Sequence, residues 1–239
     1  MTFASKTLWA VGYSSLSRFI QIAQSIGASE VAIRTDNNLE RAIDRFHEVG
    51  IGVIGWRWPS AERARAMIEA DRAKKFFDLG MDGYYVDPEG APGEHYDWDQ
   101  QGLEGGASDF CSAIVAAAAG RRFGVTSHFR GKFQHRNLPW AQFFEQADVL
   151  LPQSYWRTSK GTVKGGDPAA NYREGISSWV ATGGSLSLIC PMAGELASVQ
   201  GVELNSYGAQ ATQSGVAAGH FYTYDDKVTD DVWATVATL

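Results

Sequence analysis

Two carboxylates lie two residues apart near the middle of the chain, at Asp87 and Glu89. The residues before them, Gly83 to Val86, indicate a short buried β-strand that ends at the pair. Side chains at positions i and i+2 leave a strand on the same side, about 6–7 Å apart at ~3.3 Å per residue. Neighbouring carboxyl groups push each other's protonation states apart, so this spacing predicts acid–base chemistry. An ordinary turn is the alternative, because Asp-Pro-Glu-Gly is also a common turn composition.

The elements around the pair decide between these interpretations. Strand-like runs are expected at 8–11, 31–34, 51–56, 84–87, 123–128, 148–155, 186–190 and 220–224. Helix-like segments are expected at 15–25, 39–46, 61–79, 108–119, 140–146, 169–181 and 206–216, with a closing helix capped by Thr229.

This alternation predicts an α/β fold with a parallel sheet. Eight such units in 239 residues favour a single (β/α)8 TIM barrel over residues 1–239. An open doubly wound sheet is the rival, but the first strand lacks the GxGxxG turn that binds dinucleotides.

Active sites of such barrels lie at the carboxyl ends of the strands, so the residues that follow each strand should share one mouth. We expect Asp87 and Glu89 to be the catalytic pair there. The candidate substrate-binding residues are Arg34, Asp36, Arg57, Trp58, His128, Gln153, Tyr155, Trp156, Tyr222 and Tyr224.

Several of these residues have a structural alternative. Arg34 and Arg57 are equally well explained as neutralising Asp36 or Asp87, and a solitary histidine such as His128 is more often a hydrogen-bonded wall residue. Trp56 is expected in the core. The acids of the loop after strand four are expected on a solvated face: Glu94, Asp97, Asp99 and Glu104.

A barrel whose fourth strand ends in Asp87-Pro88-Glu89 and whose sixth ends in Pro152-Gln153-Ser154-Tyr155-Trp156 resembles glycoside hydrolases. The pattern is most similar to the family-25 enzymes (lysozyme-type muramidases) and uncharacterised barrels related to them. The chain departs from that family at the first strand, which ends in Val11-Gly12-Tyr13-Ser14 where the family has an aspartate. Asp36 and Asp225 are candidates for a third carboxylate.

The resemblance implies hydrolysis of a polysaccharide, in particular an amino-sugar polymer such as peptidoglycan. Glu89 would be the general acid, and Asp87 would stabilise charge or orient the substrate. If an N-acetyl carbonyl of the substrate is the nucleophile, Gln153 and Tyr155 could bind the acetamide, with Trp58, Trp156 and Tyr224 stacking on sugar faces. The alternative is a non-catalytic barrel that binds glycan or protein within a larger assembly. A lysine-dependent aldolase ranks low, because no lysine falls within a predicted strand.

Charge and composition restrict the possible partners. The net charge of −6 and pI of about 5.4 disfavour nucleic acid and anionic membranes. There is no apolar run of ~20 residues and no signal-peptide pattern, so we expect a soluble protein made in the cytoplasm, released by lysis or by a dedicated secretion machine if it acts outside. Cys111 and Cys190 are expected as buried thiols, and the five histidines form no metal motif, so no metal or cofactor is expected. The oligomeric state remains open.

Overall fold

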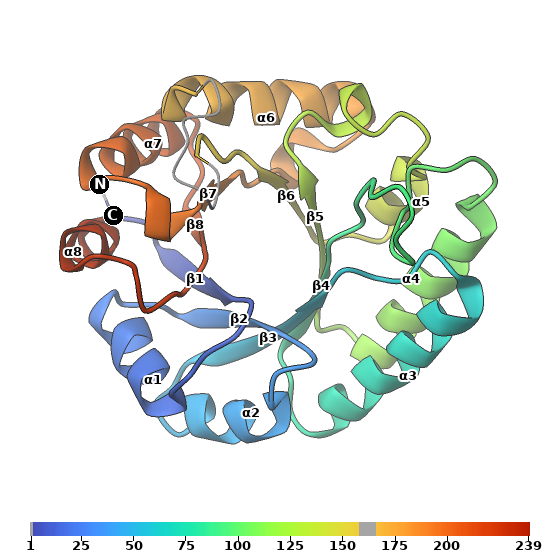
Figure 1. Ribbon diagram of the computed structural model, residues 1–239, viewed down its shortest axis with the longest axis horizontal. Helices are drawn as coiled ribbons and strands as arrows, with labels where there is room; N and C mark the ends of the chain where they lie inside the picture. The colour runs from blue at the N-terminus through green and yellow to red at the C-terminus, as the bar shows by residue number, and fades with distance from the viewer. Residues whose placement is uncertain (1, 158–165) are drawn as a thin grey trace.

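The computed structural model describes residues 2–157 and 166–239. Parallel strands form a closed barrel in chain order, and helices surround it as an outer ring (Figure 1), which confirms the predicted (β/α)8 fold. The strands are β1 (Ser5–Ala10), β2 (Glu30–Arg34), β3 (Gly52–Arg57), β4 (Gly83–Val86), β5 (Arg122–His128), β6 (Val149–Gln153), β7 (Met192–Gly194) and β8 (Ala218–Tyr222). The helices are α1 (Leu16–Ser25), α2 (Leu39–His47), α3 (Arg63–Asp78), α4 (Glu104–Ala118), α5 (Trp140–Glu145), α6 (Pro168–Thr182), α7 (Gly201–Gln213) and α8 (Asp230–Thr238).

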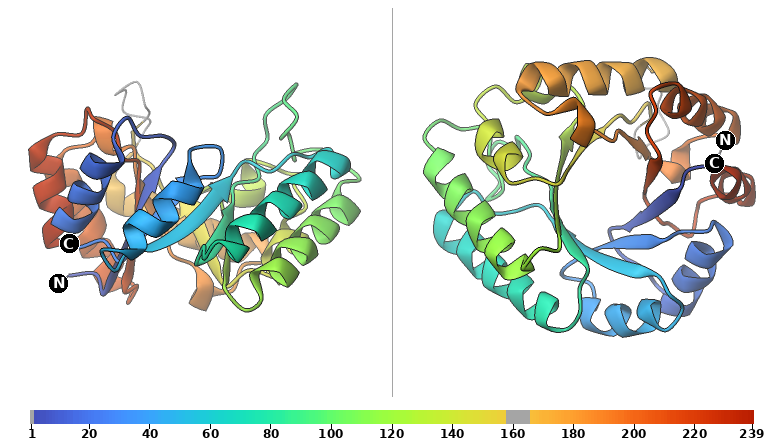
Figure 2. Two further views of the ribbon diagram at one scale, coloured as in Figure 1. Left: turned by 90° about the horizontal axis from the view of Figure 1, so that it is seen from below. Right: turned by 180° about the vertical axis from the view of Figure 1, so that it is seen from behind.

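Side-chain caps fix where several helices begin. The Ser15 hydroxyl accepts from the Arg18 amide before α1, the Asp167 carboxylate from the Ala170 amide before α6, and the predicted cap Thr229 from the Val232 amide before α8. Each cap satisfies an amide that the first helical turn leaves unpaired. The two chain ends lie side by side (Figure 2). No helix in the described part of the chain has the length and apolarity needed to cross a membrane.

The seventh strand differs from the prediction. Residues 186–190 do not form it: Leu186–Leu188 is a 3-10 helix, and Ile189 makes only an isolated bridge to Leu150. Leu186 is 64% exposed, so this apolar run lacks the continuous burial of a barrel strand. The barrel is closed instead by β7, after Pro191, which pairs with β6 through Met192 and Gln153 and with β8 over its whole length.

Large aromatic side chains fill the barrel interior beneath the mouth. Trp9 stacks on Tyr85 with ring centroids 5.4 Å apart, and the indole N–H of Trp56 donates to the Ala10 carbonyl at 3.0 Å. Trp56 is fully buried, as predicted. Trp58, at the mouth, packs edge-on against Trp56 with centroids 5.1 Å apart. The floor of the mouth is therefore a rigid aromatic core.

Lys6 lies inside β1, so the expectation that no lysine falls within a strand is wrong. The residue is near the amino end of its strand, opposite the mouth. Its ammonium donates to three backbone carbonyls at 2.8–3.0 Å, those of Ile26, Val236 and Ala237. Lys6 thus ties α1 and α8 to the barrel floor.

Cys111 and Cys190 are both buried free thiols, and burial raises the pKa of each to about 12.

Gly124 on β5 leaves space for a core tyrosine. A Cβ atom at this position would lie 2.5 Å from the Tyr85 ring and 2.7 Å from a Val149 methyl group. We therefore expect Gly124→Ala to lower the free energy of unfolding by about 1–3 kcal/mol, the usual effect of overpacking a core. Gly106→Ala, in α4 with no atom within 4 Å of the added methyl group, should raise it by roughly 0.5 kcal/mol. Urea denaturation of both variants measures the difference, and equal effects would contradict this account of the core.

Candidate active site

The carboxylate pair is held on ordered backbone at the carboxyl end of β4. The Asp87 amide donates to the Arg57 carbonyl at 2.9 Å and so extends the ladder between β3 and β4 beyond Val86. The Glu89 carbonyl accepts from the Trp98 amide at 2.8 Å, and Glu89 forms a bridge with Asp97. Neither carboxylate belongs to a free turn.

Both carboxyl groups line a cavity of about 390 Å³ at the mouth of the barrel. Its walls come from the ends of five strands, β3, β4, β6, β7 and β8, and from the loop after β4. The lining residues are Trp58, Asp87, Glu89, Gly90, Ala91, Tyr96, Gln153, Tyr155, Glu195 and Tyr222.

The inner carboxyl group is Asp87, which is 6% exposed. The Gln153 amide donates to its Oδ1 at 2.8 Å, and Trp58 also hydrogen-bonds it. Burial raises the pKa of Asp87 well above its ordinary value, and the adjacent charge and hydrogen bond of Glu89 raise it further. Asp87 therefore keeps a proton at a pH where an exposed aspartate is ionised, and that proton lies between the two carboxyl groups.

The outer carboxyl group is Glu89, which is half-buried and faces a histidine. His135 Nε2 lies 3.2 Å from Glu89 Oε2, and His135 Nδ1 lies 3.9 Å from an Asp99 carboxylate oxygen. His135 comes from the loop after β5 and is not among the residues predicted from the sequence.

Two tyrosines form the wall opposite the pair. Tyr155 and Tyr222 stack with centroids 5.4 Å apart and an angle of 17° between the rings. Burial raises the pKa of both hydroxyls, and nearby negative charge adds to the effect, so both stay protonated. They are neutral hydrogen-bonding groups beside the carboxylates.

Glu195 and Tyr96 also line the cavity but are missing from the predicted set. Glu195 directly follows β7, at the carboxyl end of the strand. Burial raises its pKa, and the charge of Asp225 raises it further. Tyr96 stacks on Trp58 with centroids 6.1 Å apart, and its position in a long loop gave no periodic signal.

Arg34, Asp36 and Arg57 lie outside the cavity in a network of ion pairs. Asp36 is 2.7 Å from Arg34 and 3.4 Å from Arg57, and Arg57 also reaches Glu69 at 3.5 Å. Burial acts to raise the pKa of Asp36, but the hydrogen bond and charge of Arg34 and the charge of Arg57 outweigh it and lower the pKa. The interpretation as a neutralising network is confirmed, and direct substrate binding by these residues stays a prediction. The Arg34 guanidinium lies 5.4 Å from the Trp58 ring centroid and supports that indole.

Two aromatic residues expected to stack on sugars are buried elsewhere. Trp156 is fully buried and packs on Tyr207, and Tyr224 is 4% exposed and packs on Phe19 and Trp233. Both expectations are wrong. Trp156 lies beyond the end of β6, and Tyr224 lies beyond the end of β8.

Other loop residues are structural. His128 is not among the lining residues: its Nδ1 accepts from the Arg130 amide at 3.2 Å and its ring stacks on Phe129, as expected for a wall residue. Asp97 is 7% exposed and accepts from the Ala91 amide, so its expected solvation is wrong.

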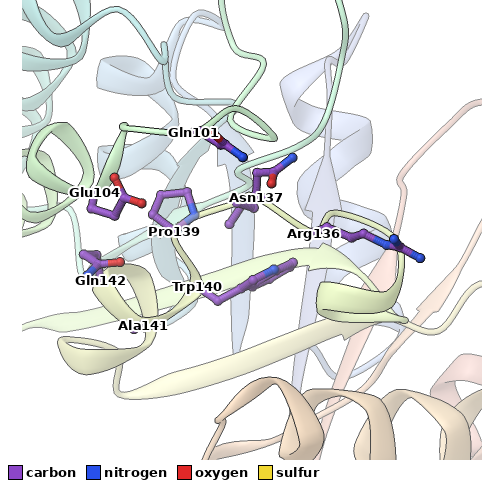
Figure 3. A pocket seen from close by; sticks show the side chains of 9 residues that line it. Gln101, Glu104, Arg136, Asn137, Pro139, Trp140, Ala141 and Gln142 are labelled. Atoms are coloured by element: carbon purple, nitrogen blue, oxygen red, sulfur yellow. The ribbon is translucent and has the colours of Figure 1, made fainter.

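A second hollow of about 380 Å³ lies between the first residues of α4 and α5 (Figure 3). It is lined by Gln101, Glu104, Arg136, Asn137, Leu138, Pro139, Trp140, Ala141 and Gln142. Neither carboxylate of the pair reaches it. Across residues 2–157 and 166–239, no three His, Cys, Asp or Glu side chains converge in a way that could hold a metal ion.

No protein-family model and no curated protein matches the chain, whereas many solved structures share its fold. The class V chitinase of Pseudomonas fluorescens Pf-5 has a TM-score of 0.68 and 9% identity over 98% of both chains. The PgaB (BpsB) glycoside hydrolase domain of Bordetella bronchiseptica has a TM-score of 0.67 and 11% identity over 97% of this chain and 98% of that one. The spore cortex-lytic enzyme SleL of Bacillus megaterium QM B1551 has a TM-score of 0.67 and 9% identity, covering 98% of this chain and 74% of SleL. At this identity the likeness shows a fold shared with glycoside hydrolase barrels and leaves the reaction to the site itself.

The raised pKa of Asp87 makes folding stability depend on pH. The folded protein binds this proton more tightly than the unfolded chain, so stability falls as the pH rises above the ordinary carboxyl range of ~4. Asp87→Asn removes the ionisation and keeps an oxygen that accepts from Gln153. We expect this variant to exceed the wild type in free energy of unfolding at pH 7 by on the order of 1 kcal/mol, and to lose that advantage below pH ~4.

Denaturant titrations from pH 3 to pH 8 measure this difference. Asp71→Asn, which alters an exposed carboxylate on α3, is the matched control and should show no such pH-dependent gain. A constant difference between Asp87→Asn and the wild type over the whole range would contradict the raised pKa.

Proposed function

We propose that this chain hydrolyses glycosidic bonds in a polysaccharide and that the cavity holding Asp87 and Glu89 is the catalytic site. The observation that carries the proposal is the carboxyl pair itself: one buried group that retains a proton lies in hydrogen-bonding contact with a second, more exposed one. Glycoside hydrolysis requires a proton for the leaving oxygen and a means of stabilising positive charge at the sugar carbon. The pair can supply both.

In this mechanism the pair holds one proton, which passes from Asp87 to Glu89 and from Glu89 to the glycosidic oxygen as the C–O bond breaks. Both groups are then carboxylates, and Asp87 lies beside the developing positive charge. Glu89 later removes a proton from the water that completes hydrolysis and shares it with Asp87. Each carboxyl group thus returns to its starting state.

The contact between the carboxyl groups favours substrate-assisted catalysis. Inverting enzymes separate their carboxyl groups by about 6.5–9.5 Å and retaining enzymes by about 5–5.5 Å, and hydrogen-bonded groups are closer than either. The nucleophile would then be the carbonyl oxygen of an N-acetyl group on the substrate. Asp87 would accept from the acetamide N–H, and the neutral Tyr155 hydroxyl would donate to its carbonyl. This geometry supports an amino-sugar polymer as the substrate.

The remaining cavity residues fit a neutral sugar chain. Trp58 and Tyr96 offer aromatic faces for stacking, and Tyr222 and Gln153 offer hydrogen bonds. Three carboxylic acids and no lysine or arginine are among the lining residues that the structure describes, which disfavours phosphorylated substrates. The chitinase and the cortex-lytic enzyme that share the fold support a polymer of N-acetylated sugars. The finer assignment, a peptidoglycan hydrolase like the family-25 muramidases, rests on the Asp-Pro-Glu motif and residues 152–156.

Conservative variants of the pair test the proposal. Glu89→Gln should lower kcat by roughly 10²–10⁴-fold, because it removes the acid without changing the shape of the side chain. Asp87→Asn should lower kcat at least tenfold, because Glu89 loses its proton source. Turbidity loss of purified cell walls and mass spectrometry of N-acetylated oligosaccharides measure the cleavage.

Glu94→Gln is the control, since this exposed carboxylate lies in the same loop but outside the cavity, and its activity should stay within about twofold of the wild type. Equal activity of the wild type and both pair variants would refute the catalytic role. Saccharide binding without any product from the wild type would instead support the non-catalytic binding barrel.

A further inference from the structure

A histidine from a separate loop is fixed against Glu89. The His135 amide donates to the Gly131 carbonyl at 3.0 Å, and the His135 carbonyl accepts from the indole N–H of Trp140 at 2.8 Å. Trp140 is in turn buried at the start of α5 (Figure 3). The imidazole is 8% exposed, so its position is set by packing and backbone hydrogen bonds.

The loop after β4 is shaped to receive this ring. A Cβ atom on Gly90 would lie 2.8 Å from His135 Cε1 and 2.9 Å from Asp99 Cβ, so only glycine lets the imidazole pack against the backbone next to Glu89. Asp99 flanks the far side of the ring, with Oδ2 3.9 Å from Nδ1. Asp99 is itself held, because its Oδ1 accepts from the Asn137 amide at 2.6 Å.

We propose that His135 is a positioning residue for Glu89: its Nε2–H donates to Glu89 Oε2 and leaves the other carboxyl oxygen to exchange the proton. This inference rests on the proposed function. Glu89 lies beyond the end of β4, where the strand no longer restricts its long side chain. A proton donor must be held within hydrogen-bond reach of the oxygen that it serves. Gln153 holds Asp87 in the same way from the end of β6.

The groups facing Glu89 come from several elements. Asp87 lies on its own segment, His135 on the loop after β5, Tyr155 after β6, and Tyr222 on β8, while Glu195 lines the same cavity. Among these groups His135 is the one that places a nitrogen within hydrogen-bond distance of Glu89, with Nε2 3.2 Å from Oε2. Its removal should therefore affect the carboxyl pair directly.

Two substitutions separate positioning from simple packing. His135→Leu removes the donor and keeps an apolar bulk, and it should lower kcat by about ten- to a hundredfold while KM stays within about twofold. His135→Gln keeps an N–H near the position of Nε2 and should recover most of the lost kcat. His47→Gln, at a histidine paired with Asp82 at 2.7 Å on α2, is the control and should match the wild type.

A second readout does not depend on turnover. Carbon-13 NMR of the labelled Asp87 and Glu89 carboxyl groups follows the ionisation of the pair. The pH at which the pair ionises should be higher in His135→Leu than in the wild type, because the lost hydrogen bond stabilises the ionised form. In His135→Gln this pH should return toward the wild-type value. A wild-type protein without hydrolytic activity would refute the proposed function, and the titration would still decide the role of His135.

The inference would be overturned by an unchanged kcat in His135→Leu, by a change confined to KM, or by equal losses in the Leu and Gln variants. An unmoved carboxyl titration would overturn it as well. If His135→Leu fails to fold, the titration and kcat of His135→Gln decide alone: wild-type-like values support the donor role, and a loss comparable to that of Glu89→Gln refutes it.

Discussion

The hydrogen bond between the buried Asp87 carboxyl group and Glu89 is the interaction on which the rest of the mouth depends. Two carboxylates cannot both be ionised at this contact without a large electrostatic cost, so the pair retains a proton. The side chains around the pair then have to hold two chemically similar carboxyl groups in different protonation states. Gln153 and Trp58 hydrogen-bond the inner group, and His135 faces the outer one. Burial, more than any single charge, makes the two carboxyl groups different.

The barrel provides the rigidity that this arrangement needs. Beneath the pair, Trp9, Trp56 and Tyr85 pack into a continuous aromatic layer, and Trp58 rests edge-on upon it. The Ser127 hydroxyl donates to the Pro88 carbonyl at 2.7 Å, which fixes the residue between the two carboxylates from the neighbouring strand. A buried carboxyl group reduces stability when it ionises, and a well-packed core can sustain that cost. The pair is thus built into the closed barrel through both its floor and its neighbouring strand.

The features that could be predicted from the sequence are those that depend on hydrophobic periodicity and on where strands end. Alternation of strands and helices indicated the barrel, and the residues at the carboxyl ends of strands four, six and eight included Asp87, Gln153 and Tyr222, which do share a cavity. His135 and Tyr96 could not be predicted, because they reach the site from irregular loops whose course depends on tertiary contacts. β7 was misplaced because an apolar run is not by itself evidence of burial.

Fold similarity and site geometry contribute different kinds of support. Identities of 9–11% to chitinase, cortex-lytic and PgaB barrels establish a common scaffold, which also serves unrelated chemistries. What favours glycoside hydrolysis is a condition that the scaffold alone does not impose: a protonated inner acid in contact with an outer acid, in a cavity that has aromatic walls and no lining lysine or arginine among the described residues. Burial of Asp87 makes its ionised form unfavourable in the folded state. The same burial keeps a proton on Asp87 that is available to Glu89. Stability and the proposed catalysis therefore depend on one carboxyl group in opposite ways, and a substitution that improves one should impair the other.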